Sequence, residues 1–193
     1  MATRARAIIK PRIIMGIDPG TNILGYGIIA CAGNNIKLQA AGVVRLDTLL
    51  DPYLKLKRIH ERVTLLIKDF KPTEFAIEAP FFGKNVQSML KLGRAQGVAI
   101  SVAMTHNVKV IEYSPKKIKM SITGNGNASK EQVATMIKKY LHFAEIPTYL
   151  DTTDALAVAL CHSFQPHPSD KTVKKTTTWK SYISEYPDKI KTK

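Results

Sequence analysis

The 193-residue chain has the length of one domain, and its apolar fraction of 45% is enough to bury a core without disulfides. Lysine and arginine outnumber the acids by 29 to 15, and the resulting net charge of +14 indicates a polyanionic partner. No apolar run could span a membrane, no secretory signal is evident and the two cysteines are isolated, so we expect a cytoplasmic protein.

Three strands with short connections are predicted first. Residues 13–18 form an apolar run that ends in Asp18, and strands over 25–31 and 36–44 follow, separated by a turn signal. This order indicates an antiparallel meander. Asp18 then lies at the carboxyl end of a central strand, although an Asp-Pro-Gly turn without any chemistry is an equally simple interpretation.

The remaining predicted elements are helices and two short strands. They are a helix capped by Asp51, a strand over 75–78, a helix over 85–106, a strand over 108–113, helices over 115–122 and 129–141, and a last helix from about Asp151. This order favours an α/β fold with one five-stranded mixed sheet and helices on both faces.

Two helices carry further expectations about which side chains are buried. Val86 and Leu90 are expected on the apolar side of the long helix, and Tyr140 is expected to point inward. Gly93 and Gly97 leave a smooth patch, which suits either close approach of another helix or an ordinary core contact.

Four acids lie where two strands end and where the last helix begins. If the strands ending in Asp18 and Glu78 are parallel neighbours, both carboxylates lie at one edge of the sheet. Asp151 and Asp154 share a helix face, but Asp151 also suits an N-cap and Asp154 the positive end of the helix dipole. Glu78 is harder to explain structurally, because a carboxylate in its apolar surroundings is costly to bury unpaired.

Carboxylates without convergent histidine or cysteine favour a hard cation such as Mg²⁺ or Mn²⁺. A carboxylate dyad that acts on sugars is an alternative, but the charge of +14 fits a phosphodiester better. Two such ions about 4 Å apart would activate a water and stabilise the leaving oxygen of an in-line displacement.

Several motifs stand in order along the chain. They are Gly16–Thr21 with Gly25-Tyr26-Gly27, then Ala76-Ile77-Glu78, Lys84-Asn85, the run Leu90–Ile100 and the run Asp151–Ala157. With these separations they closely resemble the RuvC family of Holliday junction resolvases, over residues 13–164. The resemblance implies an RNase H-like nuclease domain over 13–164, between a basic extension (1–12) and a basic tail (165–193).

The family resemblance also implies the reaction and its residues. A homodimer would nick two strands of like polarity across a four-way DNA junction, leaving 5′-phosphates and 3′-hydroxyls. Two Mg²⁺ ions, for which Mn²⁺ can substitute, would be held by Asp18, Glu78, Asp151 and Asp154. Lys119 and Lys130 match basic residues near the scissile phosphate, and a solvated helix face is the alternative interpretation of both.

Further DNA contacts follow from the same resemblance. Phe81 matches an aromatic residue that stacks on an unpaired base, and neighbouring Phe82 is an alternative. The expected DNA-binding set is completed by basic and amide side chains, which are Lys84, Asn85, Lys116, Lys117, Lys119 and Lys130. A branch-migration helicase complex is the expected protein partner, in homologous recombination and DNA repair.

Two other functions compete with junction resolution. A non-catalytic junction-binding protein would keep the basic surface, but it would lack one of the four acids. An actin-like or sugar-kinase ATPase also opens with an Asp-x-Gly-Thr strand, but it needs a second phosphate loop of similar form, and no such loop follows in this sequence.

Overall fold

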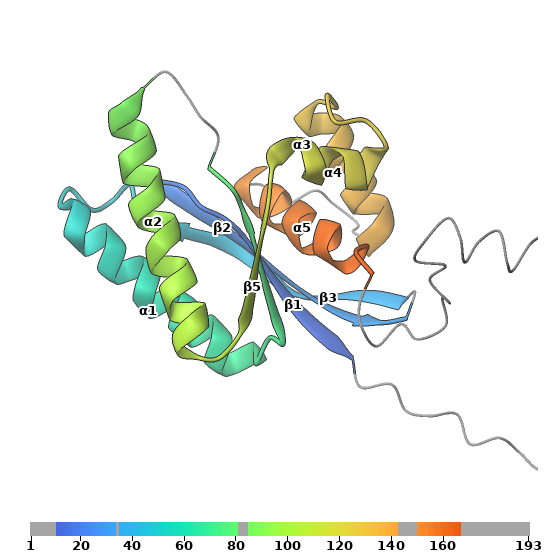
Figure 1. Ribbon diagram of the computed structural model, residues 1–193, viewed down its shortest axis with the longest axis horizontal. Coiled ribbons are helices and arrows are strands. Elements are labelled where there is room, and N and C mark those ends of the chain that lie inside the picture. The colour runs from blue at the N-terminus through green and yellow to red at the C-terminus, as the bar shows by residue number, and fades with distance from the viewer. Residues whose placement is uncertain (1–10, 34, 81–84, 143–149, 167–193) are drawn as a thin grey trace, which may run out of the picture.

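The computed structural model describes residues 11–33, 35–80, 85–142 and 150–166. One five-stranded sheet with the order β3-β2-β1-β4-β5 lies at the centre of this part of the chain (Figure 1). Its strands are β1 (Arg12–Asp18), β2 (Ile23–Ala32), β3 (Asn35–Arg45), β4 (Glu74–Glu78) and β5 (Lys109–Tyr113). The first three pair antiparallel, whereas β4 runs parallel to β1 and β5 parallel to β4. The predicted mixed sheet is confirmed.

Helices cover both faces of the sheet, as predicted. Helices α1 (Pro52–Phe70) and α2 (Val86–Thr105) pack on one face, and α3 (Pro115–Thr123), α4 (Lys130–Leu141) and α5 (Leu150–Ser163) lie on the other (Figure 1). A hydrophobic core lies on each face of the sheet, and successive side chains of β1 point alternately into one core and the other. Ile14 packs with α5, whereas Met15 and Ile17 pack with α1 and α2.

The helix starts follow the predicted capping chemistry. The Asp51 carboxylate accepts a hydrogen bond of 2.7 Å from the Tyr53 amide, and Pro52 occupies the first turn of α1. Ser129 and Gln132 form a reciprocal capping box at the start of α4. Helix α5 is buried almost all round, as its uniformly apolar sequence predicts.

Two glycines allow α5 to lie directly against the sheet. A Cβ atom on Gly16 would stand 2.3 Å from the Ala155 carbonyl oxygen, and one on Gly25 would stand 2.0 Å from the Asp151 carbonyl oxygen. Any larger residue at either position would push the helix away. Since Gly25 pairs with Asp18 across β1 and β2, the first turn of α5 is held beside the end of β1.

The predicted burial is wrong for three side chains. Val86 and Leu90 are 64% and 53% exposed, because α2 packs on the sheet through small residues such as Ala95 and Ala99. This close packing leaves the larger apolar side chains on the outer face. Tyr140 is 37% exposed and packs beside the Phe164 ring at the surface.

The two glycines of α2 also lie on its outer face. Within the described part of the chain, no atom lies within 4 Å of a Cβ atom built on Gly93 or Gly97, so neither makes the core contact considered above. Among the described helices, none combines the length and apolar character that crossing a bilayer would need.

Candidate active site

Strands β1 and β4 bring two acids to one edge of the sheet. Asp18 is the last residue of β1 and Glu78 is the last residue of β4. The strands are parallel neighbours, with Ile17 opposite Ile77, so the next residue on each strand is one of the two acids. The condition on which the sequence argument depended is therefore met.

The first turns of α5 place the other two acids at the same edge. Gly25 pairs with Asp18 in the sheet and lies directly under the Asp151 backbone. Asp154 follows one turn later and its carboxylate reaches the Lys130 ammonium at 2.7 Å. All four acids are half-buried. Acids that served only to cap a helix or to interact with its dipole would not need to be buried.

The carboxylates of this edge act on one another electrostatically. Burial, followed by the charges of Glu78, Asp154 and Asp151, raises the pKa of Asp18 to about 8. Burial and the Asp154 charge likewise raise the pKa of Glu78 to about 7. Among the described residues, the four side chains therefore form a single cluster whose negative charge the neighbouring cations do not fully offset.

Two lysines partly offset this charge. Lys130, at the start of α4, pairs with Asp154, and this hydrogen bond raises the pKa of the lysine. The charges of Lys130 and, to a smaller extent, of Lys119 on α3 act against this rise in the pKa of Glu78. The structure thus places both predicted lysines next to the acids. Lys116 and Lys117 are exposed on the same helix as Lys119.

The donor chemistry of the cluster fits a hard divalent cation. Its ligands are carboxylate oxygens, and a cation would relieve the repulsion that raises the pKa values of Asp18 and Glu78. In the described part of the chain, no three acid, histidine or cysteine side chains converge closely enough to ligate one ion. The Asp154 carboxylate is instead held by Lys130.

The predicted DNA-contacting residues divide into two groups. Phe81, Phe82 and Lys84 lie outside the described residues. Asn85 is described, and its side chain caps α2 by accepting a hydrogen bond of 3.1 Å from the Ser88 amide. A structural role for Asn85 is thus present beside the predicted DNA contact.

Two polar residues near the site were not predicted from the sequence. The buried Gln96 amide donates to the Glu112 carboxylate at 3.1 Å and to the Glu78 carbonyl at 3.4 Å, which links α2 to the end of β4. The Lys55 ammonium donates to the Thr21 carbonyl at 3.2 Å and to Asn22 at 3.1 Å, and it steadies the turn after Asp18. For Gln96, the signal available in the sequence was a glutamine among the small residues on one face of α2.

Comparison with known proteins identifies the family. Residues 14–162 match the model of the family described as "Crossover junction endodeoxyribonuclease RuvC". Relatives with that description from Cytophaga hutchinsonii and Bacteroides fragilis are 58% and 51% identical, covering 94% and 95% of this chain and 89% and 98% of theirs.

The fold of the chain is similar to that of a solved resolvase. A structure described as "T. thermophilus RuvC in complex with Holliday junction substrate" is 34% identical, with a TM-score of 0.75 over 79% of this chain and 93% of that one. The RNase H-like fold expected from the sequence is thereby confirmed. The chain belongs to the RuvC family of crossover junction endodeoxyribonucleases.

Proposed function

We propose that this protein resolves four-way DNA junctions by symmetric paired nicks, through hydrolysis at the edge that carries Asp18, Glu78, Asp151 and Asp154. The observation that carries the proposal is the cluster itself. Four half-buried carboxylates on three elements lie at one edge of the sheet, and burial together with the neighbouring acids raises the pKa values of Asp18 and Glu78, which is costly to the fold and is explained by a bound cation. Membership of the family makes the chain a Mg²⁺-dependent nuclease.

The four acids are proposed to hold two Mg²⁺ ions, for which Mn²⁺ can substitute. When bound, such ions polarise the scissile phosphate and make water a better nucleophile. Asp18 stands between Glu78 on one side and the two acids of α5 on the other, so it is the candidate shared ligand. The products are expected to carry 5′-phosphates and 3′-hydroxyls.

The two lysines have separate roles in this proposal. Lys130 keeps the Asp154 carboxylate in place through its ion pair of 2.7 Å. Lys119 is not in an ion pair within the described residues, and its charge already acts on Glu78, so it is free to oppose charge that develops on the phosphate. Both lysines also add to the positive potential that attracts DNA.

The DNA substrate is supported by charge and by a relative. A protein from T. thermophilus is described in complex with a Holliday junction substrate, and the +14 charge suits the same ligand here. Lys116 and Lys117 continue the basic surface from Lys119 along α3. Phe81 or Phe82, together with Lys84 and Asn85, remain the proposed contacts near the crossover.

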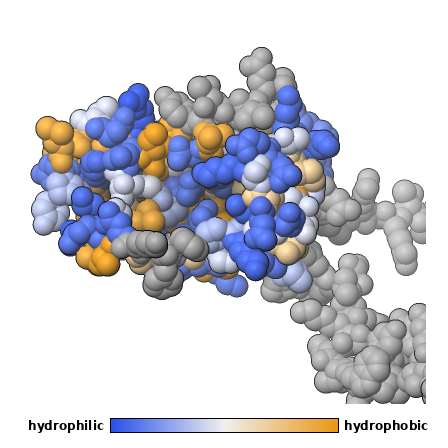
Figure 2. All heavy atoms as spheres, turned by 90° about the horizontal axis from the view of Figure 1, so that it is seen from above, coloured by the Kyte–Doolittle hydropathy of each residue, from blue (hydrophilic) through white to orange (hydrophobic). Residues whose placement is uncertain are grey.

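The outer face of α2 supports a homodimer. Val86, Leu90, Gly93, Gly97 and Met104 recur at spacings of three, four and seven, so they form one stripe along the helix. The three larger side chains are each more than half exposed, and the glycines open the surface between them. Figure 2 shows exposed hydrophobic atoms mainly on the α1 and α2 side of the molecule.

This stripe suits a second copy of the chain, related by a two-fold axis. Two active sites in one complex would allow both nicks within the lifetime of a single encounter. Replacing Gly97 with leucine should separate the dimer, because the added side chain blocks close helix contact. Sedimentation would detect the monomer, and the control variant Arg62→Leu, which places a leucine at an exposed position of α1, should stay dimeric. A branch-migration helicase complex is proposed as the protein partner. The division of the chain into a basic extension (1–12), a nuclease domain and a basic tail (165–193) is likewise a proposal.

Cleavage of a synthetic four-way junction tests the proposed function. In Mg²⁺, the purified protein should introduce two symmetric nicks that a ligase can seal, while linear duplex DNA of the same sequence remains intact. Tight junction binding without cleavage in either Mg²⁺ or Mn²⁺ would instead indicate a non-catalytic junction-binding protein. The Asp18→Asn variant should lose this cleavage. Asp47→Asn is its matched control and should keep it, since Asp47 is an exposed acid paired with Arg45.

A further inference from the structure

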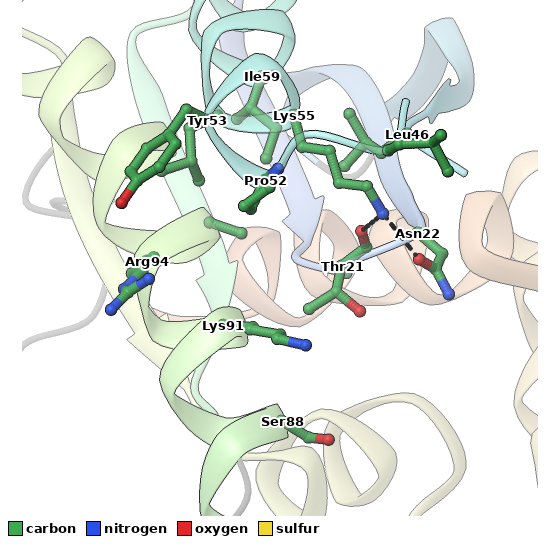
Figure 3. Close-up of a pocket in the computed structure, with 14 residues that line it drawn as sticks. Thr21, Asn22, Leu46, Pro52, Tyr53, Lys55, Ile59, Ser88, Lys91 and Arg94 are labelled. Atoms are coloured by element: carbon green, nitrogen blue, oxygen red, sulfur yellow. Dashed lines mark hydrogen bonds between the residues drawn. The ribbon is translucent and has the colours of Figure 1, made fainter. Parts of the chain in front are cut away.

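A groove of about 340 Å³ opens beside the turn that follows Asp18 (Figure 3). The turn Gly20–Asn22 forms one wall, the start of α1 forms the second, and one flank of α2 forms the third. Its volume lies at the lower end of the range for ligand sites. The groove begins two residues after Asp18, so a ligand in it would lie next to the acid cluster.

The groove is lined by cations and by no acid among the described residues. Lys55 is occupied, since its ammonium donates to the Thr21 carbonyl and to Asn22. Lys91 and Arg94, on exposed positions of α2, form no ion pair within the described part of the chain. In Figure 3, Lys91 points from α2 toward Thr21, whereas Arg94, one turn along α2, points away from Thr21.

Apolar and aromatic side chains form the rest of the lining. Leu50 is 99% exposed and Tyr53 is 72% exposed, and both stand at the rim. Leu56 and Ile59 lie deeper, on the inner side of α1. A surface that combines unpaired cations with an exposed aromatic ring suits a nucleotide, because phosphates bind the cations and bases or sugars pack on the ring.

We propose that this groove binds the junction strand adjacent to the scissile phosphate, with Lys91 and Arg94 on backbone phosphates and Tyr53 against a sugar or base. The inference rests on the proposed function, because it extends the path of the same DNA strand. It assigns Lys91, Arg94 and Tyr53 to substrate binding rather than to the reaction itself. Lys55 acts indirectly, since it holds the turn that separates the groove from Asp18.

A second copy of the chain is the less suitable occupant. The stripe proposed for the dimer lies on the outer face of α2, whereas Lys91 and Ala95 line the flank that faces α1. Two copies joined through this groove by a two-fold axis would bring like charges together. DNA supplies the opposite charge instead.

A pair of double variants tests the proposed contacts. In Lys91→Ala/Arg94→Ala, junction affinity should fall roughly ten- to hundredfold, and the slope of log affinity against log salt should become shallower by about 2. The turnover at saturating junction should stay within about threefold of wild type, because neither residue touches the reacting atoms. The matched control is Arg58→Ala/Lys68→Ala, which removes the same charge from exposed α1 positions outside the groove.

Cross-linking locates the strand directly. Both cysteines of the chain are buried, so Ser88→Cys places a reactive thiol at the end of the groove. Junctions with a disulfide tether at successive nucleotides should cross-link at one or two positions next to the scissile phosphate, in metal-free buffer. Arg58→Cys is the control and should give weak, unlocalised products.

The possible results distinguish a failure of the groove proposal from a failure of the proposed junction cleavage. Unchanged salt dependence in Lys91→Ala/Arg94→Ala, or equal cross-linking by Ser88→Cys and Arg58→Cys, would overturn the groove proposal while junction cleavage by wild type stands. Loss of the dimer in the double variant without a change in salt slope would assign the groove to a second copy. Failure of the wild-type protein to cut any junction would instead remove the proposed function.

Discussion

Strand β4 begins and ends with a glutamate, and the two have opposite surroundings. Glu74 is buried, yet hydrogen bonds and charges from Arg12 and His162 outweigh its burial and lower its pKa to about 2. Glu78, four residues later, has its pKa raised to about 7 by burial and by the Asp154 charge. Two glutamates on one strand therefore differ in their surroundings: the charge of Glu74 is balanced by neighbouring side chains, whereas that of Glu78 is not balanced by the described residues.

The partners of Glu74 complete a buried network across the sheet. Arg12 binds both carboxylate oxygens, at 2.8 and 2.6 Å, and His162 bonds to Glu74 on one side and to the Tyr113 hydroxyl, at 2.7 Å, on the other. This arrangement satisfies the carboxylate without any ion from solution. Burial alone therefore does not mark a functional acid. What distinguishes Glu78 is that the cations among the described residues do not offset its burial and the Asp154 charge.

The largest effect is expected for activity at the Glu78 end. Glu78→Gln and Asp18→Asn should each lower junction cleavage by about a thousandfold or more, because a cation ligand is lost. Mapped nicks on a synthetic junction measure this loss, and circular dichroism confirms that the variants are folded. Wild-type rates in either variant would contradict the assignment of the site.

The same substitution at the other end should affect stability instead. Glu74→Gln should lower the free energy of unfolding by about 1–3 kcal/mol, because Arg12 loses its carboxylate partner in a part-buried setting. Cleavage per folded molecule should remain near wild type. Urea titration measures the first quantity and junction cleavage below the unfolding transition measures the second; a catalytic defect without destabilisation would reverse the roles given to the two glutamates.

The lowered pKa of Glu74 also predicts an acid dependence of stability. Because its folded pKa is about 2, below the ordinary value of 4.5, its contribution is fully present above pH 4.5 and is lost as pH falls toward 2. Glu74→Gln should therefore lose less stability than wild type over this interval. Parallel urea titrations of both proteins at a series of pH values would reveal equal losses if the ion pair were unimportant.

The smallest effect is expected at the edge of the network. Tyr113→Phe removes the hydroxyl that bonds to His162 and should cost about 1 kcal/mol, since one hydrogen bond is lost in a buried site. Cleavage should be unchanged, because the substitution removes only the hydroxyl that bonds to His162 and leaves the backbone pairing of Tyr113 with Glu78 intact. Thermal unfolding measures the cost, and a loss as large as that of Glu74→Gln would mean that the tyrosine, rather than the ion pair, holds the network together.

Sequence reasoning located the Glu78 end and missed the Glu74 end for one physical reason. Asp18, Glu78, Asp151 and Asp154 each lie at the end of a recognisable element, so topology alone brings them together. Glu74 is bound by residues 62 and 88 positions away, and such pairing depends on side-chain packing that no local pattern displays.

Burial on α2 was mispredicted for a related reason. Periodicity finds the larger apolar side chains of a helix, such as Val86 and Leu90, but it does not tell which neighbour they pack against. In the folded chain the small residues of α2 pack against the sheet. The larger side chains are exposed on the outer face, where we propose that a second copy binds. Caps such as Asp51 and the Ser129 capping box were predictable because they depend on residues within one turn.

The most direct test of the contrast between the two glutamates is the change in unfolding temperature caused by Mg²⁺. A cation that binds only the folded state stabilises it by mass action. Mg²⁺ should raise the unfolding temperatures of wild type and of Tyr113→Phe or Glu74→Gln by similar amounts, and that of Glu78→Gln far less. An equal rise in Glu78→Gln and wild type would contradict a cation site at the end of β4.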